Sequence, residues 1–158
     1  MPCGVAHTFA MVFREIEFGS SDFKKECELR HRVLRIPIGR SLYDENLDME
    51  RNQLHFGLFD DQQTLVACVI AVLLSATESK IRQMAVSAEF QKQGHGRRVI
   101  TSLEEYLSKI KCRKVLLHAR ASALGFYEKL GYAKVGAEFM EVGLPHFRME
   151  KDLKVGCS

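Results

Sequence analysis

The feature that most constrains the fold is a change of sequence pattern at about residue 86. Before it, the apolar segments His55–Phe59, Leu65–Leu74 and Lys80–Val86 are separated by short polar turns, and such connections join antiparallel strands. After it, a glycine-containing loop leads into an amphipathic segment and then into the apolar run Lys114–Leu117. This strand–helix–strand order requires a parallel crossover. We therefore predict an α/β fold with a mostly antiparallel mixed sheet, one parallel βαβ crossover and helices on both faces.

The remaining elements are predicted from periodicity and from turn residues. Val99, Leu103 and Leu107 recur at helical spacing in the crossover segment. Gly131 ends the next helix, because glycine readily adopts the left-handed conformation there. No linker or repeat interrupts residues 1–158, which we expect to form a single domain. The further elements expected are strands at Thr8–Phe18, Tyr132–Phe139 and Phe147–Lys151, helices at about Phe23–Leu34 and Ala121–Leu130, and a short helix within Arg40–Asn52.

Composition narrows the class of protein. The net charge of +3 is weak evidence for a nucleic-acid partner, since such partners favour strong basic patches. The longest apolar run, Leu65–Leu74, is about half of the ~20 residues that a membrane helix needs. The five cysteines are scattered and form no C-x-x-C pair, which fits neither a disulfide framework nor a metal site. We expect a cytoplasmic protein with free thiols, no metal, and no membrane or nucleic-acid partner.

The loop Gln91–Arg97 is the most informative segment. Its two glycines stand between a strand and an amphipathic helix, where unpaired N–H groups of the first helical turn can bind phosphate. No G-K-[ST] follows, which excludes a P-loop, and Val99 replaces the third glycine of a dinucleotide fingerprint. An ordinary glycine-rich helix start and an unrelated nucleotide-binding α/β domain are the alternatives.

Three motifs together resemble the GNAT superfamily of acetyl-CoA-dependent N-acyltransferases. Gln91–Gly96 fits the phosphate loop [Q/R]-x-x-G-x-[G/A] of that family at every fixed position. Gly125–Tyr132 resembles its F-Y-x-x-x-G-[FY] signature, and Glu141–Met149 resembles the E-x-G-[IL]-P-H-x-x-M tail of the small bacterial ElaA-like group. The resemblance extends over roughly residues 54–153. Because many members of this family form dimers, it also implies that a homodimer is one assembly open to this protein.

The resemblance implies a set of contacts with acetyl-CoA. The backbone of Met84, Ala85 and Val86 would pair with the pantetheine arm, and a backbone N–H near Val86 would face the thioester oxygen. Backbone N–H groups of Gln93–Arg97 would bind the diphosphate. His118, where relatives often carry a cofactor-binding Asn, either contacts the cofactor or closes a strand end. The residues implied in cofactor binding are Met84, Ala85, Val86, Gln91, Lys92, Gln93, Gly94, His95, Gly96, Arg97, His118, Phe126 and Tyr127.

Acyl transfer to an amine needs an acid for the thiolate and a neutral amine. The resemblance implies that Tyr127 protonates the departing thiolate, and a phenol with a pKa near ~10 remains protonated at neutral pH. Its alternative role is that of a core aromatic, because Leu124, Tyr127 and Leu130 share one helical face. An ammonium with a pKa of ~10.4 is neutral only about once in 10³ to 10⁴ molecules at pH 7, so a base or a desolvating pocket must assist.

The identity of the base is left open by the sequence. Many relatives carry a Glu shortly before the apolar triplet of the central strand, where this chain has Arg82 and Gln83. His146 is the first candidate, because imidazole titrates near neutral pH, and Glu141 is the second. The alternatives are a structural histidine and a solvated surface carboxylate.

These observations predict an N-acetyltransferase that transfers an acetyl group from acetyl-CoA to a primary amine of a small molecule or peptide. Attack would be direct, within a ternary complex. The acidic stretch from Asp44 to Glu50 either attracts a cationic acceptor or forms a solvated face. The alternative function is a non-catalytic acyl-CoA-binding sensor or scaffold of the same fold, which the Arg82–Gln83 departure motivates.

Overall fold

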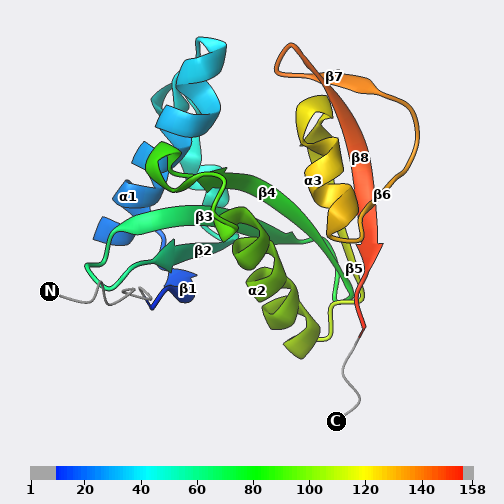
Figure 1. The fold of residues 1–158 in the computed structure, drawn as a ribbon, viewed down its shortest axis with the longest axis horizontal. Helices are drawn as coiled ribbons and strands as arrows, with labels where there is room; N and C mark the ends of the chain where they lie inside the picture. Colours follow the sequence, from blue (N-terminus) through cyan, green and yellow to red (C-terminus); the bar gives the residue numbers. More distant parts are fainter. Residues whose placement is uncertain (1–9, 155–158) are drawn as a thin grey trace, which may run out of the picture.

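A computed structural model describes residues 10–154 of the chain (Figure 1). Over this range, one twisted sheet has the strand order β1-β2-β3-β4-β5-β8-β6, with β7 paired to β8 beside this path. The strands are β1 (Val12–Ile16), β2 (Leu54–Phe59), β3 (Leu65–Leu73), β4 (Glu78–Val86), β5 (Lys114–Arg120), β6 (Ala133–Lys134), β7 (Phe139–Glu141) and β8 (Leu144–Asp152). The α-helices are α1 (Ser21–Arg30), α2 (His95–Lys109) and α3 (Leu124–Lys129).

The strand pairing confirms the predicted mixed sheet. Strands β1 to β4 pair antiparallel in chain order. Strand β5 then pairs parallel with β4, after a crossover through α2, and β8 returns antiparallel to β5. The single parallel pair therefore lies where the sequence pattern changes, because only a helix-length connection can return the chain to the same end of the sheet.

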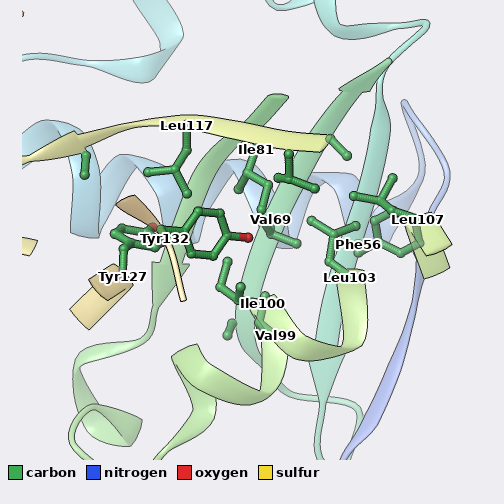
Figure 2. Close-up of a cluster of buried hydrophobic side chains, with 14 of the residues drawn as sticks. Phe56, Val69, Ile81, Val99, Ile100, Leu103, Leu107, Leu117, Tyr127 and Tyr132 are labelled. Carbon is green, nitrogen blue, oxygen red and sulfur yellow. The ribbon is translucent and has the colours of Figure 1, made fainter. Parts of the chain in front are cut away.

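Helices cover both faces of the sheet, as predicted. Val99, Ile100, Leu103 and Leu107 of α2 form one buried cluster with β2, β3, β4 and β5, part of which Figure 2 shows. On the other face, α1 packs through Phe23, Cys27 and Leu29 in a second cluster. Neighbouring residues of β3 divide between the two clusters, since successive strand side chains point to opposite faces. This explains why Leu65–Leu73 is apolar throughout.

The region between α1 and β2 differs from the predicted short helix. A π-helical segment (His31–Arg35) and 3₁₀ turns at Ile36–Ile38, Leu42–Asp44 and Leu47–Glu50 lead from α1 to β2. The side chains of Ser41 and Asn46 accept hydrogen bonds from backbone N–H groups two residues ahead. Such local bonds compete with a continuous helix. The helical turns that follow α1 continue to Ile38, and Gly39 ends them with a φ of 71°.

The C-terminal third also differs in detail. The predicted strand Tyr132–Phe139 is interrupted, because Gly136 adopts a φ of 85° between β6 and β7. Strands β7 and β8 form a hairpin whose two turn residues, Val142 and Gly143, have positive φ angles of 47° and 75°. The predicted left-handed Gly131 is confirmed, with a φ of 96°.

Two expectations lie partly outside the described range. The predicted first strand, Thr8–Phe18, corresponds to β1, but its first two residues fall outside residues 10–154. Cys27, Cys68 and Cys112 are free thiols, whereas Cys3 and Cys157 are not described. Between residues 10 and 154, no helix has both the length and the apolar character needed to cross a bilayer.

Candidate active site

Strands β4 and β5 diverge at the centre of the sheet (Figure 1). Within the described chain, their pairing extends only from Glu78–Ile81 on β4 against Lys114–Leu117 on β5. Beyond this point, the register of β4 against β3 shifts, so that Gln83 and Met84 oppose a single residue of β3. Gln83 has a φ of 57°, and such a bulge bends its strand. The β5-facing backbone of β4 is therefore free of sheet pairing beyond Ile81.

A cavity of about 460 Å³ opens where the two strands separate. Its walls come from β4, β5, α3, the β7–β8 hairpin and the segment after α1. Five residues that the sequence singled out line this cavity: Met84, His118, Tyr127, Glu141 and His146. The fold thus brings together side chains that are up to about sixty positions apart in the sequence, and the size is that of a small-molecule site.

The glycine loop lies at the start of α2. Gly94 and Lys92 adopt φ angles of 84° and 62°, and no side chain caps the helix. The Gln91 side chain donates from Nε2 to the Val86 carbonyl (3.0 Å), and the Gln93 side chain donates to the Glu89 carbonyl (3.3 Å). These bonds fix the loop against the end of β4. The first-turn N–H groups remain available, with the positive end of the helix dipole behind them.

Gly96 shows why this loop requires a residue without a side chain. A Cβ at this position would lie 3.3 Å from the Phe126 ring and 3.7 Å from the Met84 methyl carbon. Met84 also lines the cavity, so the loop and the cavity are connected through one side chain. Phe126 is therefore a packing partner of the loop. Lys92, Gln93 and Arg97 are exposed, and the His95 ring lies against Phe90 with ring centroids 6.0 Å apart.

Tyr127 is both a core residue and a wall of the cavity. Its side chain packs edge-on against Phe126 and Tyr132, and only 8% of the residue is exposed (Figure 2). Burial raises its pKa to about 12, which keeps the phenol protonated. Tyr132 differs, because its hydroxyl donates to Glu104 (2.7 Å). Among the described residues, the Tyr127 hydroxyl makes no hydrogen bond, so it is available to a ligand in the cavity.

Glu141, which also lines the cavity, lies between two histidines. Its Oε1 is 3.1 Å from Nδ1 of His118, and its Oε2 is 3.6 Å from Nε2 of His146. The other nitrogen of His146, Nδ1, donates to the Leu144 carbonyl (2.9 Å). This bond fixes the ring, so that Nε2 faces the carboxylate. The arrangement can hold or pass on one proton.

Phe139 was not predicted from the sequence to lie beside these residues. Its ring lies 4.9 Å from that of His118, edge-on, and 6.0 Å from that of His146, stacked. It therefore holds both imidazoles from the side. The β7–β8 hairpin positions Phe139 opposite His146, and only the two-residue turn Val142–Gly143 could have predicted that pairing.

The acidic stretch Asp44–Glu50 has little unpaired negative charge to attract a cation, because Glu45 and Glu50 are paired with arginines. The Arg35 guanidinium donates twice to Glu45, at 2.6 and 3.2 Å. Glu50 accepts two bonds from Arg30, at 2.8 and 2.6 Å. The arginines neutralise these carboxylates, and the Arg35 bond holds the pKa of Glu45 below its usual value. The expectation of a cationic acceptor therefore loses its support here.

The same two arginines hold the bulge of β4. Arg30 Nε and Arg35 Nη2 donate to the side-chain oxygen of Gln83, at 3.3 and 3.0 Å. Glu26, Glu50 and His55 form a buried group whose possible ligand atoms lie within 4.8 Å of one another. However, Arg30 bonds to both carboxylates, and His55 Nδ1 lies 2.9 Å from Glu26. The guanidinium thus occupies the place that a cation would take.

Comparisons with known proteins agree with this geometry. A model of the acetyltransferase (GNAT) domain matches residues 38–153. The chain is 35% identical to Bacillus subtilis YyaT over 75 residues, which cover 48% of this chain and 51% of YyaT. The chain thus spans about half the length of this relative. Among solved structures, a Lactobacillus plantarum protein superimposes with a TM-score of 0.83 at 18% identity, covering 92% of this chain and 99% of that one.

Escherichia coli ElaA has this fold too, with a TM-score of 0.77 at 19% identity over 90% of this chain and 99% of ElaA. The family model covers well over half of the chain. The chain therefore belongs to the GNAT acetyltransferase family, which confirms the resemblance drawn from its motifs.

Proposed function

We propose that this protein is an N-acetyltransferase that transfers an acetyl group from acetyl-CoA to a primary amine by direct attack in a ternary complex. The observation that carries the proposal is the connection between two sites. The loop at the start of α2 lies beside Met84, since a Cβ added at Gly96 would be 3.7 Å from the Met84 methyl carbon, and Met84 lines a cavity that Tyr127 and Glu141 also line. An anionic carrier held at the loop and a reacting group in the cavity fit this layout.

The residues present fit acetyl-CoA, which supplies the thioester acyl group. The first turn of α2 has no side-chain cap, and at Gly96 there is little room for a side chain beside Phe126 and Met84; free N–H groups at such a helix start suit a diphosphate. Exposed Lys92 and Arg97 add positive charge. The unpaired edge of β4 from Met84 to Val86 offers backbone groups to an extended arm.

Tyr127 and Glu141, which both line the cavity, divide the proton chemistry between them. Because its pKa is raised to about 12, Tyr127 remains a donor and can give a hydrogen bond or a proton to a departing thiolate. Glu141, with His118 and His146 beside it, can accept the proton of an ammonium. Deprotonating that ammonium at pH 7 costs about 4–5 kcal/mol in water. Glu141 and the two histidines would lower this cost.

Several further properties belong to the same proposal. Residues 1–158 act as one acyltransferase domain, in the cytoplasm, on a small-molecule or peptide amine. The charge pattern supports neither a nucleic-acid nor a membrane partner, and the chemistry needs no metal. A homodimer is the assembly we expect, and its mass in solution by light scattering tests this.

The proposal is tested by measuring thiol release from acetyl-CoA with a panel of primary amines. Thiol release that requires the presence of an amine supports the proposed acetyltransferase function. A second candidate, a non-catalytic acyl-CoA sensor, is favoured by one observation: Gln83 occupies the bulge without a carboxylate and is bonded to two arginines. Tight CoA binding without turnover across the panel would support the sensor, whereas calorimetric preference for ATP or NAD over CoA would overturn both.

A further inference from the structure

The cavity wall formed by the diverging strands is rich in cations. Lys80 and Arg82 of β4 and Arg120 of β5 all line it. Lys80 and Arg82 share a sheet face, because Ile81 between them packs into the α2 cluster on the other side. All three cationic side chains are partly buried, so their charges are less screened than those of fully exposed groups.

None of these three side chains forms an ion pair within residues 10–154. Arg82 donates from Nη1 to the neutral amide oxygen of Gln53 (2.9 Å). Arg120 donates to the Leu34 carbonyl (3.4 Å), and Lys80 has neither a side-chain hydrogen bond nor a salt bridge in the described region. By contrast, Arg35, which lines the same cavity, is paired with Glu45. Of the four cationic side chains that line the cavity, Arg35 is therefore neutralised by an ion pair, whereas the other three have no carboxylate partner in the described region.

These cations repel one another. Burial lowers the pKa of Lys80, and the charges of Arg82 and Arg148 lower it further, against the opposing effect of Glu141. Glu141 itself is engaged with His118. Clustered, partly desolvated charges of one sign are unfavourable unless a counter-ion binds them. The wall is thus arranged for an anion.

The side chains that would bind an anion lie next to those that would accept a proton. In the β5–β8 register, Arg120 pairs with His146, and His118 pairs with Arg148. Cationic and imidazole side chains therefore alternate at adjacent positions around Glu141. A ligand with an amine and an anionic group a few atoms apart can reach both at once.

We propose that the acceptor of this acetyltransferase carries an anionic group, a carboxylate or a phosphate, near its primary amine, and that Lys80, Arg82 and Arg120 bind this group. The inference rests on the proposed function, and it replaces the cationic acceptor that the acidic stretch had indicated. The anion is distinct from the diphosphate of acetyl-CoA, because the loop Gln91–Arg97 does not line the cavity. Binding of the anion orients the amine toward Glu141.

The test compares primary amines with and without an anionic group. An ω-amino acid is paired with its carboxamide, and an aminoalkyl phosphate with its amino alcohol, and kcat/KM is measured for each. We expect at least a tenfold preference for the member of one pair that carries the anionic group, and that pair identifies the anion. Equal or better turnover of the members that lack the anionic group, or of a polyamine, overturns the inference while leaving the acetyltransferase function intact.

Variants assign the effect to the named residues. Arg82→Gln and Arg120→Gln should each lower kcat/KM at least tenfold for the amine that carries the anionic group, change it by less than threefold for the counterpart that lacks this group, and leave CoA affinity unchanged. Lys24→Gln, which removes an exposed cation of α1, is the matched control. A fall in CoA affinity in Arg82→Gln would overturn the inference, since it would assign these cations to the donor.

A binding measurement separates the inference from the proposed function. Calorimetry with CoA-saturated protein measures the affinity for the anionic amines without turnover. If no amine is acetylated but the anionic amine binds and Arg82→Gln abolishes that binding, the proposed function fails and the anion site stands. If neither binding nor charge preference is seen, the anion site is overturned.

Discussion

Substitution of Gly96 by Val tests the link between the loop and the cavity. The added Cβ alone would lie 3.3 Å from the Phe126 ring, closer than ordinary van der Waals contact, and two further methyl groups must displace Phe126 or Met84. Such overpacking costs about 1–3 kcal/mol of folding free energy, offset by about 0.5–1 kcal/mol because glycine loses more backbone entropy on folding. The variant should therefore fold, with a loss of stability of about 2 kcal/mol or less.

The effect on CoA binding should be much larger. A hydrogen bond to a charged group contributes about 1.5–3 kcal/mol, so loss of two N–H contacts to the diphosphate removes about 3–6 kcal/mol, or about 10²- to 10⁴-fold in Kd. Calorimetry with CoA measures the affinity, and circular dichroism checks the fold. Gly125→Val is the control, because a Cβ at Gly125 meets nothing within 4 Å. Unchanged CoA affinity in a folded Gly96→Val protein would refute the assignment of the loop.

Three further predictions concern protons. Tyr127→Phe should lower kcat about 10²-fold or more with little change in CoA affinity, and wild-type turnover would exclude Tyr127 as the acid. Glu141→Gln should lower kcat/KM for the amine about 10²-fold or more with little change in CoA affinity; wild-type kcat/KM in this variant would assign the base to His146. Burial lowers the pKa of His55, but its hydrogen bonds to Glu26 and to the Glu50 carbonyl and the charges of both carboxylates together raise it above its usual value, so its stabilising effect is complete below about pH 6.5 and is lost as the pH rises through its folded pKa. Chemical denaturation of the wild type and His55→Gln should show this loss only in the wild type.

The sheet and the loop could be predicted because their signals are local. Apolar runs, short turns and the glycines before Val99 specify strands, connections and a helix start over a few residues each. Gly131 likewise ends α3 through its own backbone freedom, with a φ of 96°. The polar turns around Ser41 and Asn46 were mistaken for a helix, because side-chain caps and helical periodicity coincide there.

The charge balance of the cavity could not be predicted, because it depends on pairing between distant segments. Glu45 and Arg35 are ten residues apart and Glu141 and His118 are twenty-three residues apart, so no local pattern shows which carboxylates are neutralised. The sequence placed negative charge at the acceptor side from residues Asp44 to Glu50. The folded chain instead pairs Glu45 and Glu50 with arginines and leaves the cations of β4 and β5 facing the cavity.

The place of Gln83 explains why the proton acceptor must lie elsewhere in this protein. Its side-chain oxygen accepts from both Arg30 and Arg35, and Arg30 is fully buried. A carboxylate between two guanidinium groups would have a strongly lowered pKa and would be a weak base, so a base on the central strand is incompatible with this arginine pair. Gln83 serves instead to fix the bulge that separates β4 from β5. We therefore propose the hairpin carboxylate Glu141, which lies beside the imidazoles of His118 and His146, as the proton acceptor.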